Sequence, residues 1–370
     1  MRGNRSEVAF ARSASVPSLV SVRLPAMSWT PTRLPACRPS SGSILSARDN
    51  RGFSIFVSGA KNRTRPRSDY EAMAPAPPGP GTVGDRVLRE KERAENFPVA
   101  LRILPRDLRA DLVAVYDVAR VIDDLGDESA IEDRTPGLLR FQRDLERAFR
   151  GDQPHERVLR DLLPAIHRRD LELDPFNRLV RANLQDQRVA SYATQAELED
   201  YCVLSADPVG RIVLRVFGVR DPVAERLSDR VCTALQLIEH CQDVAEDRRN
   251  GRVYLPRTGL AAFGATEADL DATTTSRPVR LAVAAQTARA LDLLTEGAAL
   301  LDRLHGWARL AVAGYIAGGL ATLDALRRAR WDVLAGTPRP RKTDVLAHLT
   351  ALLVRPSAHV RRIREGGRLT

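Results

Sequence analysis

Three carboxylates recur at every fourth residue in the segment 236–247: Glu239, Asp243 and Asp247. The segment lies inside a longer run whose apolar residues recur at helical spacing, so we expect it to be helical. Positions four apart on a helix face the same side about one turn apart, which places the acids in one column with Gln236 beside it. Such a column on a helix with an apolar side is costly to bury unless a cation is present.

A second pair of carboxylates, Asp123 and Asp127, has the same spacing earlier in the chain, and Tyr116 and Arg120 continue that face. Two acidic columns on two long apolar helices would face each other across a cavity. Mg²⁺ suits such oxygen ligands, because it uses one or two carboxylates and completes its shell with water and phosphate. One such pair is usually a solvated helix face, but two pairs favour a cation site.

The two columns, together with residues 251–256 (GRVYLP), resemble the squalene/phytoene synthase family of isoprenoid enzymes. The resemblance extends from about Arg89 to about Val345. Residues 95–100 (ENFPVA) and 205–211 (SADPVGR) are most similar to one branch of the family, the bacterial hydroxysqualene synthases. That branch works in a three-enzyme route to squalene and hopanoids.

The resemblance implies an all-α fold, a single-domain helical bundle of the isoprenoid-synthase type around a central cavity. It implies Mg²⁺ as the cofactor, with Mn²⁺ as an alternative, because the departure of diphosphate needs its charge neutralised. Glu239 stands where the family commonly has Asn; glutamate is also an oxygen ligand, but its charge and reach differ. The implied metal ligands are Asp123, Asp127, Glu239, Asp243 and Asp247.

The resemblance also implies residues that act on the substrate. Arg120 matches the family's diphosphate-contacting arginine, although an ordinary ion pair with Asp123 would use the same spacing. Arg248 and Arg252 both follow the second column, and the pattern does not separate them. The implied catalytic residues are Asp123, Asp127, Asp243, Asp247 and Tyr201, and the implied substrate contacts are Tyr116, Arg120, Gln236, Arg248, Arg252, Tyr254, Asn96 and Phe97.

Several of these positions have a purely structural alternative. Tyr116, Tyr192, Tyr201 and Tyr254 match family tyrosines that line the cavity, but a tyrosine packed in the core with its hydroxyl satisfied would fit the pattern equally well. Asn96 precedes Phe97 where condensing relatives often have Ser, and it would also serve as a helix cap or turn residue.

The branch resemblance implies ionisation of presqualene diphosphate, rearrangement, and capture by water to give hydroxysqualene. The same aspartates would also serve head-to-head condensation, giving presqualene diphosphate or squalene from farnesyl diphosphate, or phytoene from geranylgeranyl diphosphate. A third hypothesis, from a different class of function, is a catalytically inactive family member that acts as a helical assembly factor. The chain has no strand followed by a glycine-rich dinucleotide turn, so we expect no NADPH. Functional coupling to other squalene-pathway enzymes fits the first hypothesis.

Positive charge is concentrated at the N-terminus. Residues 1–72 hold twelve Lys and Arg against four Asp and Glu, while residues 73–370 hold 45 against 43. The nearly neutral body gives no electrostatic support to nucleic-acid binding. We expect a disordered basic leader over 1–84, for which a transit peptide, a disordered arm and a translated upstream sequence are alternatives, and Met73 is the favoured start. The helical domain would then cover 85–354, with a basic tail over 355–370.

The helices that must position these residues can be placed from start signals and apolar spacing. Thr135–Pro136, Asp174–Pro175 and Asp221–Pro222 resemble helix starts, and Thr194 with Glu197 forms a capping box. The helix that begins at Thr194 should be interrupted or bent near Pro208 and Gly210, because a proline inside a helix removes a backbone hydrogen bond. The expected helices cover residues 85–95, 107–127, 194–217, 221–250, 278–304, 307–334 and 343–353.

The most apolar run, residues 310–323, is too short to span a bilayer, so we expect a buried core helix in which Gly314, Gly318 and Gly319 allow close packing. Contact with a membrane surface is compatible with the apolar substrates of the family. The four cysteines, Cys37, Cys202, Cys232 and Cys241, have neither disulfide nor zinc spacing, which favours reduced thiols in a cytoplasmic protein.

Overall fold

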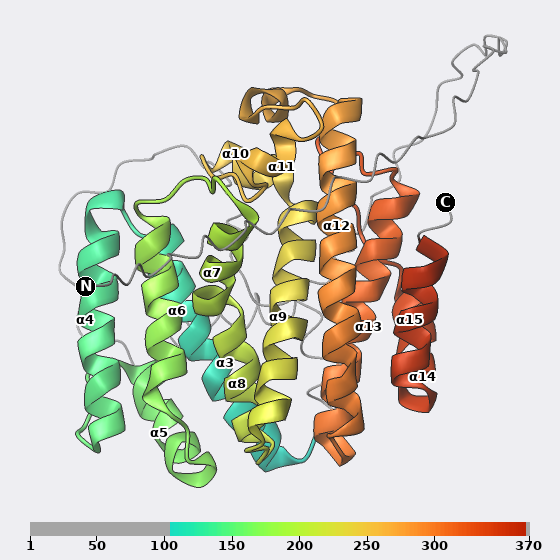
Figure 1. Cartoon of the computed structure of the whole chain (residues 1–370). Helices are drawn as coiled ribbons and strands as arrows, with labels where there is room; N and C mark the ends of the chain where they lie inside the picture. The colour runs from blue at the N-terminus through green and yellow to red at the C-terminus, as the bar shows by residue number, and fades with distance from the viewer. Residues whose placement is uncertain (1–103, 368–370) are drawn as a thin grey trace, which may run out of the picture. The chain divides into compact units, whose positions relative to one another are not determined.

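The computed structural model describes residues 104–367, which form a bundle of helices (Figure 1). These residues contain no β-strand; one isolated bridge joins Ser191 to Val253. The predicted all-α fold is confirmed. The expected leader, the helix over 85–95 and the residues Asn96 and Phe97 lie outside the described residues.

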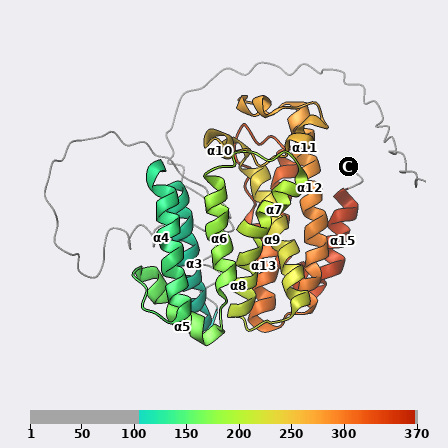
Figure 2. The same ribbon diagram turned by 60° about the vertical axis from the view of Figure 1, so that its left-hand side comes forward.

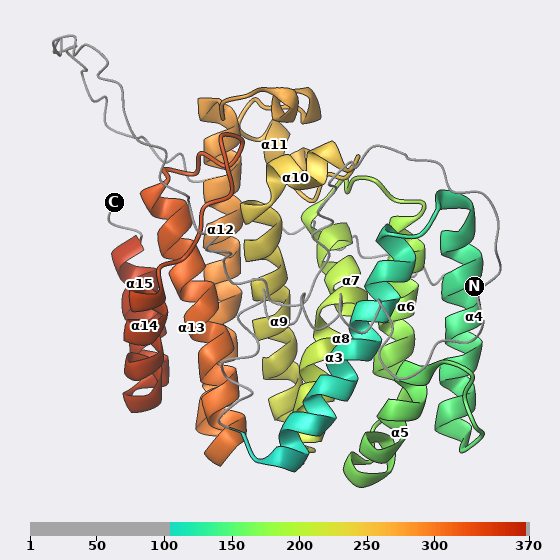
Figure 3. The same ribbon diagram turned by 180° about the vertical axis from the view of Figure 1, so that it is seen from behind.

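The first half of the described chain encloses its own apolar cluster, which includes Ile122, Leu138 and Phe176. Figure 2 shows α3, α4 and α5 together on one side with α6 next to them, and α3 runs obliquely across α8 (Figure 3). The helices of this half are α3 (Arg106–Asp127), α4 (Ile131–Arg150), α5 (Arg157–Arg169), α6 (Leu173–Asp186), α7 (Gln195–Ser205) and α8 (Asp207–Val216).

The second half encloses a larger cluster that includes Leu237, Leu294 and Ile316. The pair α9 and α12 forms its most extensive helix–helix contact. The elements of this half are α9 (Pro222–Gln242), α10 (Val244–Arg249), α11 (Arg257–Ala261), the 3₁₀ helix η1 (Glu267–Asp271), α12 (Arg277–Gly297), the 3₁₀ helix η2 (Ala298–Asp302), α13 (Gly306–Arg328), α14 (Lys342–Val354) and α15 (Pro356–Gly367).

Two predicted helix starts are confirmed at the atomic level. The Thr194 side chain accepts a hydrogen bond from the Glu197 backbone N–H, and Asp221 accepts one from the Val223 N–H. The expected break also occurs, since α7 ends at Ser205 before the Asp207–Pro208 start of α8.

Two other predicted starts are wrong. Helix α4 begins at Ile131, and Pro136 lies inside it. Helix α6 begins at Leu173, so Asp174 is inside the first turn rather than the cap. Pro175 is the third residue of α6, where its missing N–H is not needed, whereas Pro136 is the sixth residue of α4 and removes one hydrogen bond within that helix.

The predicted long helix over 221–250 is two helices. Helix α9 ends at Gln242 and α10 begins at Val244, with Asp243 between them in a non-helical conformation (φ −106°, ψ 17°). The N–H groups of Asp243 and Asp247 still bond to the carbonyls of Glu239 and Asp243, so the break is local. The acidic column is therefore a chain of acids around a kink.

Helix α13 is the core helix predicted for residues 310–323. It is the one described helix long and apolar enough to cross a membrane, and 67% of its most apolar stretch is buried inside the bundle. Gly319 fits the expected close packing, because a Cβ there would lie 2.5 Å from Leu235 Cδ2. Gly314 does not, since a Cβ there would meet open space.

The segment 355–370, expected as a basic tail, contains helix α15. Val360 is fully buried, and Ile363 packs against the larger apolar cluster. Arg364 Nε lies 2.6 Å from Asp292 Oδ1 on α12. Val360 and Ile363, three residues apart, lie on the side of the helix that packs against the bundle. The arginines around them made this short apolar pattern hard to recognise in the sequence.

Candidate active site

Three helices end on an aspartate close to α10. Asp127 is the last residue of α3, Asp186 the last of α6, and Asp243 follows the last residue of α9. Helix carboxyl ends carry partial negative charge, so an acid placed there is disfavoured without a cation nearby. Figure 1 shows α10 at that end of α9.

Arg252 supplies a positive charge at two of these helix ends, those of α3 and α6. Its Nη2 donates to Asp127 Oδ1 at 2.7 Å, and both side chains are largely buried, at 14% and 11% exposure. The same guanidinium acts electrostatically on Asp186 and Asp247. Gly251, at φ +77°, turns the chain after α10 so that Arg252 is directed back toward α3.

Asp123 lies one turn before Asp127 on α3 and accepts a hydrogen bond from Asn183 Nδ2 on α6 at 3.2 Å. Burial raises the pKa of Asp123 to about 7, while Asn183 and Arg120 oppose that rise. Both partners reach Asp123 from inside the bundle, so the carboxylate is held rather than solvated.

Asp186 gathers two tyrosines. Tyr201 on α7 donates its hydroxyl to Asp186 Oδ2 at 2.7 Å, and Tyr254 donates to Oδ1 at 3.4 Å. Burial raises the pKa of Asp186 to about 6, although Arg252 and both tyrosines stabilise its anion. Tyr192 stacks with Tyr254 and lies tilted against Tyr201, so the three rings form one aromatic wall.

The second acidic column begins beneath that wall. His240 stacks on Tyr254 at 4.0 Å with nearly parallel rings, and its Nε2 contacts Gln236 Nε2 at 2.9 Å. Burial lowers the pKa of His240 to about 3, so the ring is neutral. Burial raises the pKa of Asp243 to about 7 and that of Asp247 well above its ordinary range, where Asp243 adds to the rise.

Comparison with known proteins gives this arrangement a family. A sequence model described as squalene/phytoene synthase matches residues 91–345. The chain belongs to the squalene/phytoene synthase family. It is therefore related to enzymes of isoprenoid synthesis, and the resemblance found in the sequence is confirmed.

Individual relatives within the squalene/phytoene synthase family carry different names. A hydroxysqualene synthase of Sinorhizobium fredii is 34% identical over 227 residues, covering 61% of this chain and 75% of the relative. A presqualene diphosphate synthase of Rhodopseudomonas palustris is 32% identical over 176 residues, covering 47% and 62%. The crystal structure of squalene synthase HpnC from Alicyclobacillus acidocaldarius is 41% identical with a TM-score of 0.63, covering 67% of this chain and 95% of that one.

The squalene/phytoene synthase fold brings several of the predicted residues together around Arg252. Asp127 belongs to this group through its hydrogen bond to Arg252, and Tyr254 and Asp247 through their electrostatic interactions with it. Gln236 and Tyr116 are buried on α9 and α3. Glu239, half-buried, lies one turn before Asp243.

Two predicted arginines have other partners. Arg120 pairs with Asp124 at 3.1 Å and with Glu128 at 3.5 Å rather than with Asp123 alone. Arg248 makes two 2.7 Å bonds to Asp271 at the end of η1. The structure thus separates Arg248 from Arg252, which the sequence did not.

Sequence analysis missed Asn183 and Asp186. Neither belongs to a column, and a single acid at a helix end carries no periodic signal. A usable signal was present in residues 183–187 (NLQDQ), where four of the five side chains are polar and one of these is acidic. Basic residues, not an acid, are favoured in the last turn of a helix, so Asp186 is unusual there.

The donor set fits a hard cation. It consists of carboxylate oxygens on α3, at the end of α9 and on α10, placed near negative helix ends and half-buried. Within residues 104–367 no three His, Cys, Asp or Glu side chains converge closely enough to hold a metal by themselves. Pairs of carboxylates that share an ion with water and phosphate match the way Mg²⁺ is usually bound.

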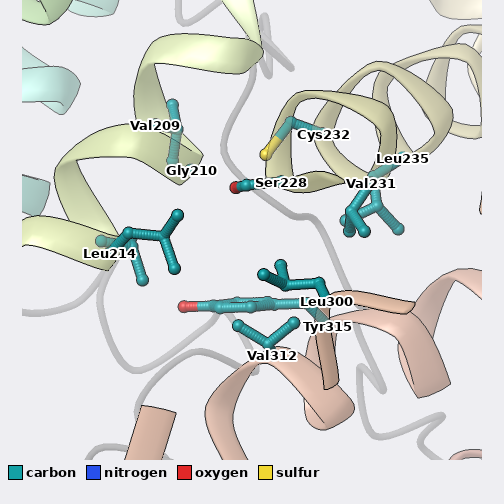
Figure 4. Close-up of a pocket in the computed structure, with 11 residues that line it drawn as sticks. Val209, Gly210, Leu214, Ser228, Val231, Cys232, Leu235, Leu300, Val312 and Tyr315 are labelled. Atoms are coloured by element: carbon teal, nitrogen blue, oxygen red, sulfur yellow. The ribbon is translucent and has the colours of Figure 1, made fainter. Parts of the chain in front are cut away.

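An apolar pocket lies lower along α9, at the seam between the two apolar clusters (Figure 4). Cys232, Gln236, Glu239 and Asp243 follow one another at steps of four, three and four residues, so one face of α9 leads from the pocket to the acids. The eleven residue steps from Cys232 to Asp243 span about 16 Å along the helix. The lining residues are Val209, Gly210, Val213, Leu214, Ser228, Val231, Cys232, Leu235, Leu300, Val312 and Tyr315.

Proposed function

We propose that the chain is a hydroxysqualene synthase: it ionises presqualene diphosphate, rearranges the resulting cation and lets water capture it, releasing hydroxysqualene and diphosphate. The observation that carries the proposal is the grouping of Asp127, Asp186 and Asp247, from three different helices, around the largely buried Arg252. The similarity to a hydroxysqualene synthase and the SADPVGR sequence of residues 205–211 support this reaction within the family.

Mg²⁺, when bound by Asp123, Asp127, Asp243 and Asp247 with Glu239 alongside, would supply the positive charge that diphosphate needs as a leaving group. Arg252 adds a fixed guanidinium to the same region, and it can exchange its bond to Asp127 for a phosphate oxygen. The acids therefore bind, and the arginine orients, the charged end of the substrate.

Asp186 fixes the hydroxyls of Tyr201 and Tyr254. Each hydroxyl donates its hydrogen to the carboxylate, so the lone pairs of the hydroxyl oxygen point away from Asp186. A hydroxyl oxygen held in this way can accept a bond from water or stabilise positive charge through its dipole. The aromatic wall also excludes bulk water from the cation.

The apolar pocket along α9 suits the far end of a prenyl chain. It lies about 16 Å along α9 from the acids, which is comparable to an extended chain of three isoprene units. Its walls are mainly Val and Leu, which do not react with a carbocation. The proposed enzyme thus separates a charged head site from an apolar tail site on the same helix.

Head-to-head condensation is the second candidate, favoured by the similarity to a presqualene diphosphate synthase. The same carboxylates would ionise farnesyl diphosphate. A product assay on the full chain with Mg²⁺ and no NADPH separates the two, with presqualene diphosphate and farnesyl diphosphate offered separately.

Hydroxysqualene formed from presqualene diphosphate is the expected product. Asp123→Asn and Asp247→Asn should each lower kcat/KM at least about a hundredfold, because each would remove a carboxylate that holds the Mg²⁺ needed to neutralise the leaving group. Asp133→Asn, at an exposed acid of α4, is the matched control and should leave the rate unchanged. Presqualene diphosphate formed from farnesyl diphosphate would instead establish condensation, and turnover of neither substrate would leave the assembly-factor alternative.

A further inference from the structure

Helix α14 presents an uncharged face to solvent. Its exposed residues from Thr343 onward are Thr343, Leu346, Ala347, Thr350, Leu353 and Val354, which we call the α14 face. Leu346 is 64% exposed and Val354 72% exposed, and Leu353 is also exposed. Helix α4 is different, because its exposed residues include Glu132, Asp133, Arg140, Arg143 and Arg150.

The fold gives the α14 face no cover within the described residues. Helix α14 packs on α13 and α15, with Leu352 fully buried on its inner side. Figures 1 and 3 show α14 and α15 along one edge of the bundle. Arg309 donates to the Leu353 carbonyl, which brings the first turn of α13, with its exposed Trp307, to the carboxyl end of α14.

Cations flank the α14 face at both ends. Arg341 and Lys342 precede it, and Arg355, Arg361 and Arg362 follow it; all five are exposed and form no ion pair with another described residue. Nearby acids are largely engaged: Asp344 pairs with Arg328, and Asp292 with Arg364. Glu365 is exposed. Residues 339–364 hold seven basic side chains and one acid.

We propose that the α14 face binds the surface of an anionic lipid membrane. An apolar helix face with arginines beside it and a tryptophan at one end has the composition of a helix that lies in the headgroup region. The arginines match the negative surface charge of such a membrane, where each cation adds attraction. A second protein copy would need acids opposite these arginines, and the same face carries none. The inference goes beyond the proposed reaction and does not depend on it.

Co-sedimentation of the full chain with vesicles tests this assignment. We expect binding to phosphatidylcholine vesicles that contain phosphatidylglycerol, and weaker binding to phosphatidylcholine alone. The pair Leu346→Ser with Val354→Ser should weaken partition at least tenfold. The pair Arg361→Gln with Arg362→Gln should weaken it several-fold on anionic vesicles and reduce its salt dependence.

Matched variants on α4 control for exposed residues in general. Ile131→Ser with Leu139→Ser, and Arg140→Gln with Arg143→Gln, should bind vesicles as the unchanged chain does. The basic segment 1–72 is present in every variant, so its own attraction to anionic lipid cancels in the comparison. Equal binding of the α14 and α4 variants would overturn the assignment. So would unchanged vesicle binding with a shift from dimer to monomer, which would make the face a contact between copies. Product formation is measured separately, without vesicles, so that a failure of membrane binding can be distinguished from a failure of the proposed reaction.

Discussion

At the scale of single residues, Asp186 organises more of the site than either predicted acidic column does. It holds two tyrosine hydroxyls and lies within the electrostatic reach of Arg252, Asp127 and Asp247. Tyr201 and Tyr254 were predicted from the family pattern, but Asp186, which orients their hydroxyls, was not. A residue that positions others leaves no periodic trace in a sequence, whereas ligands on one helix face do.

Replacing Tyr201 by Phe tests the role of Asp186 as a positioning residue. The change removes the 2.7 Å bond to Asp186 and nothing of the ring packing, so we expect kcat to fall roughly 10–100-fold with little change in KM. Tyr192→Phe is the control, because its hydroxyl receives a longer bond from Gln185 and does not bond to Asp186. Steady-state kinetics of both variants would measure the difference, and equal losses would contradict a specific role for the bond.

Asp207, in the SADPVGR segment, should make stability depend on pH. Burial and the neighbouring Asp229 raise its pKa to about 7, against the ordinary value of 3.8. Between these two values the folded chain holds a proton that the unfolded chain has lost. The free energy of unfolding therefore falls as pH rises from about 4 to about 7, by as much as roughly 4 kcal/mol, and is flat above.

Asp207→Asn keeps the oxygen that accepts from Thr233 and removes the ionisation. Its stability relative to the unchanged chain should therefore increase between pH 5 and pH 8. Urea unfolding at the two pH values measures this, with Asp133→Asn as a control at an exposed acid. A variant whose relative stability is the same at both pH values would show that Asp207 ionises normally.

At the scale of helices, α12 packs closely against α9 at Gly297. A Cβ at Gly297 would lie 2.6 Å from Val231 Cγ2, 2.9 Å from the Val231 backbone nitrogen and 3.0 Å from the Leu227 carbonyl oxygen. Two of these three atoms are backbone, which cannot move aside without shifting the helix. This glycine therefore sets the distance between the two helices.

Gly297→Ala should destabilise the fold by about 1–3 kcal/mol, as overpacking usually does. Gly314→Ala on α13 is the matched change in open space, and it should stabilise by about 0.5–1 kcal/mol through helix propensity. Thermal unfolding of the two variants should shift in opposite directions. A tolerated Gly297→Ala would mean that α12 moves away from α9 without cost.

The presence of the helices could be predicted from the sequence, because apolar spacing and caps such as Thr194 and Asp221 are signals carried by neighbouring residues. The kink at Asp243 was not, since residues 239–247 continue a helical pattern through it and tertiary packing decides the break. The starts of α4 and α6 were misplaced because a proline marks a position that a helix permits rather than the first residue of the helix. Arg248 and Arg252 could not be separated, because their partners, Asp271 and Asp127, come from distant parts of the chain.

At the scale of the whole molecule, two apolar clusters meet along α8 and α9, and the pocket lies where they meet. Its depth was not readable from the sequence, since it depends on how α13 is placed against α9. Tyr315 of α13 crosses this space, with its hydroxyl end toward Leu214 (Figure 4). Under the proposed function, that ring is the floor that limits the length of the prenyl chain.

Tyr315→Ala should therefore raise the ratio of kcat/KM for prephytoene diphosphate to that for presqualene diphosphate, by about tenfold or more, because one extra isoprene unit needs the space that the ring occupies. The variant will also lose stability, because it removes a partly buried ring that packs against the larger apolar cluster, so both substrates must be compared on the same protein sample. Tyr315→Phe keeps the ring and should leave the ratio unchanged. A ratio that does not change in Tyr315→Ala would place the chain-length limit elsewhere, while the reaction itself would still be tested by turnover of presqualene diphosphate.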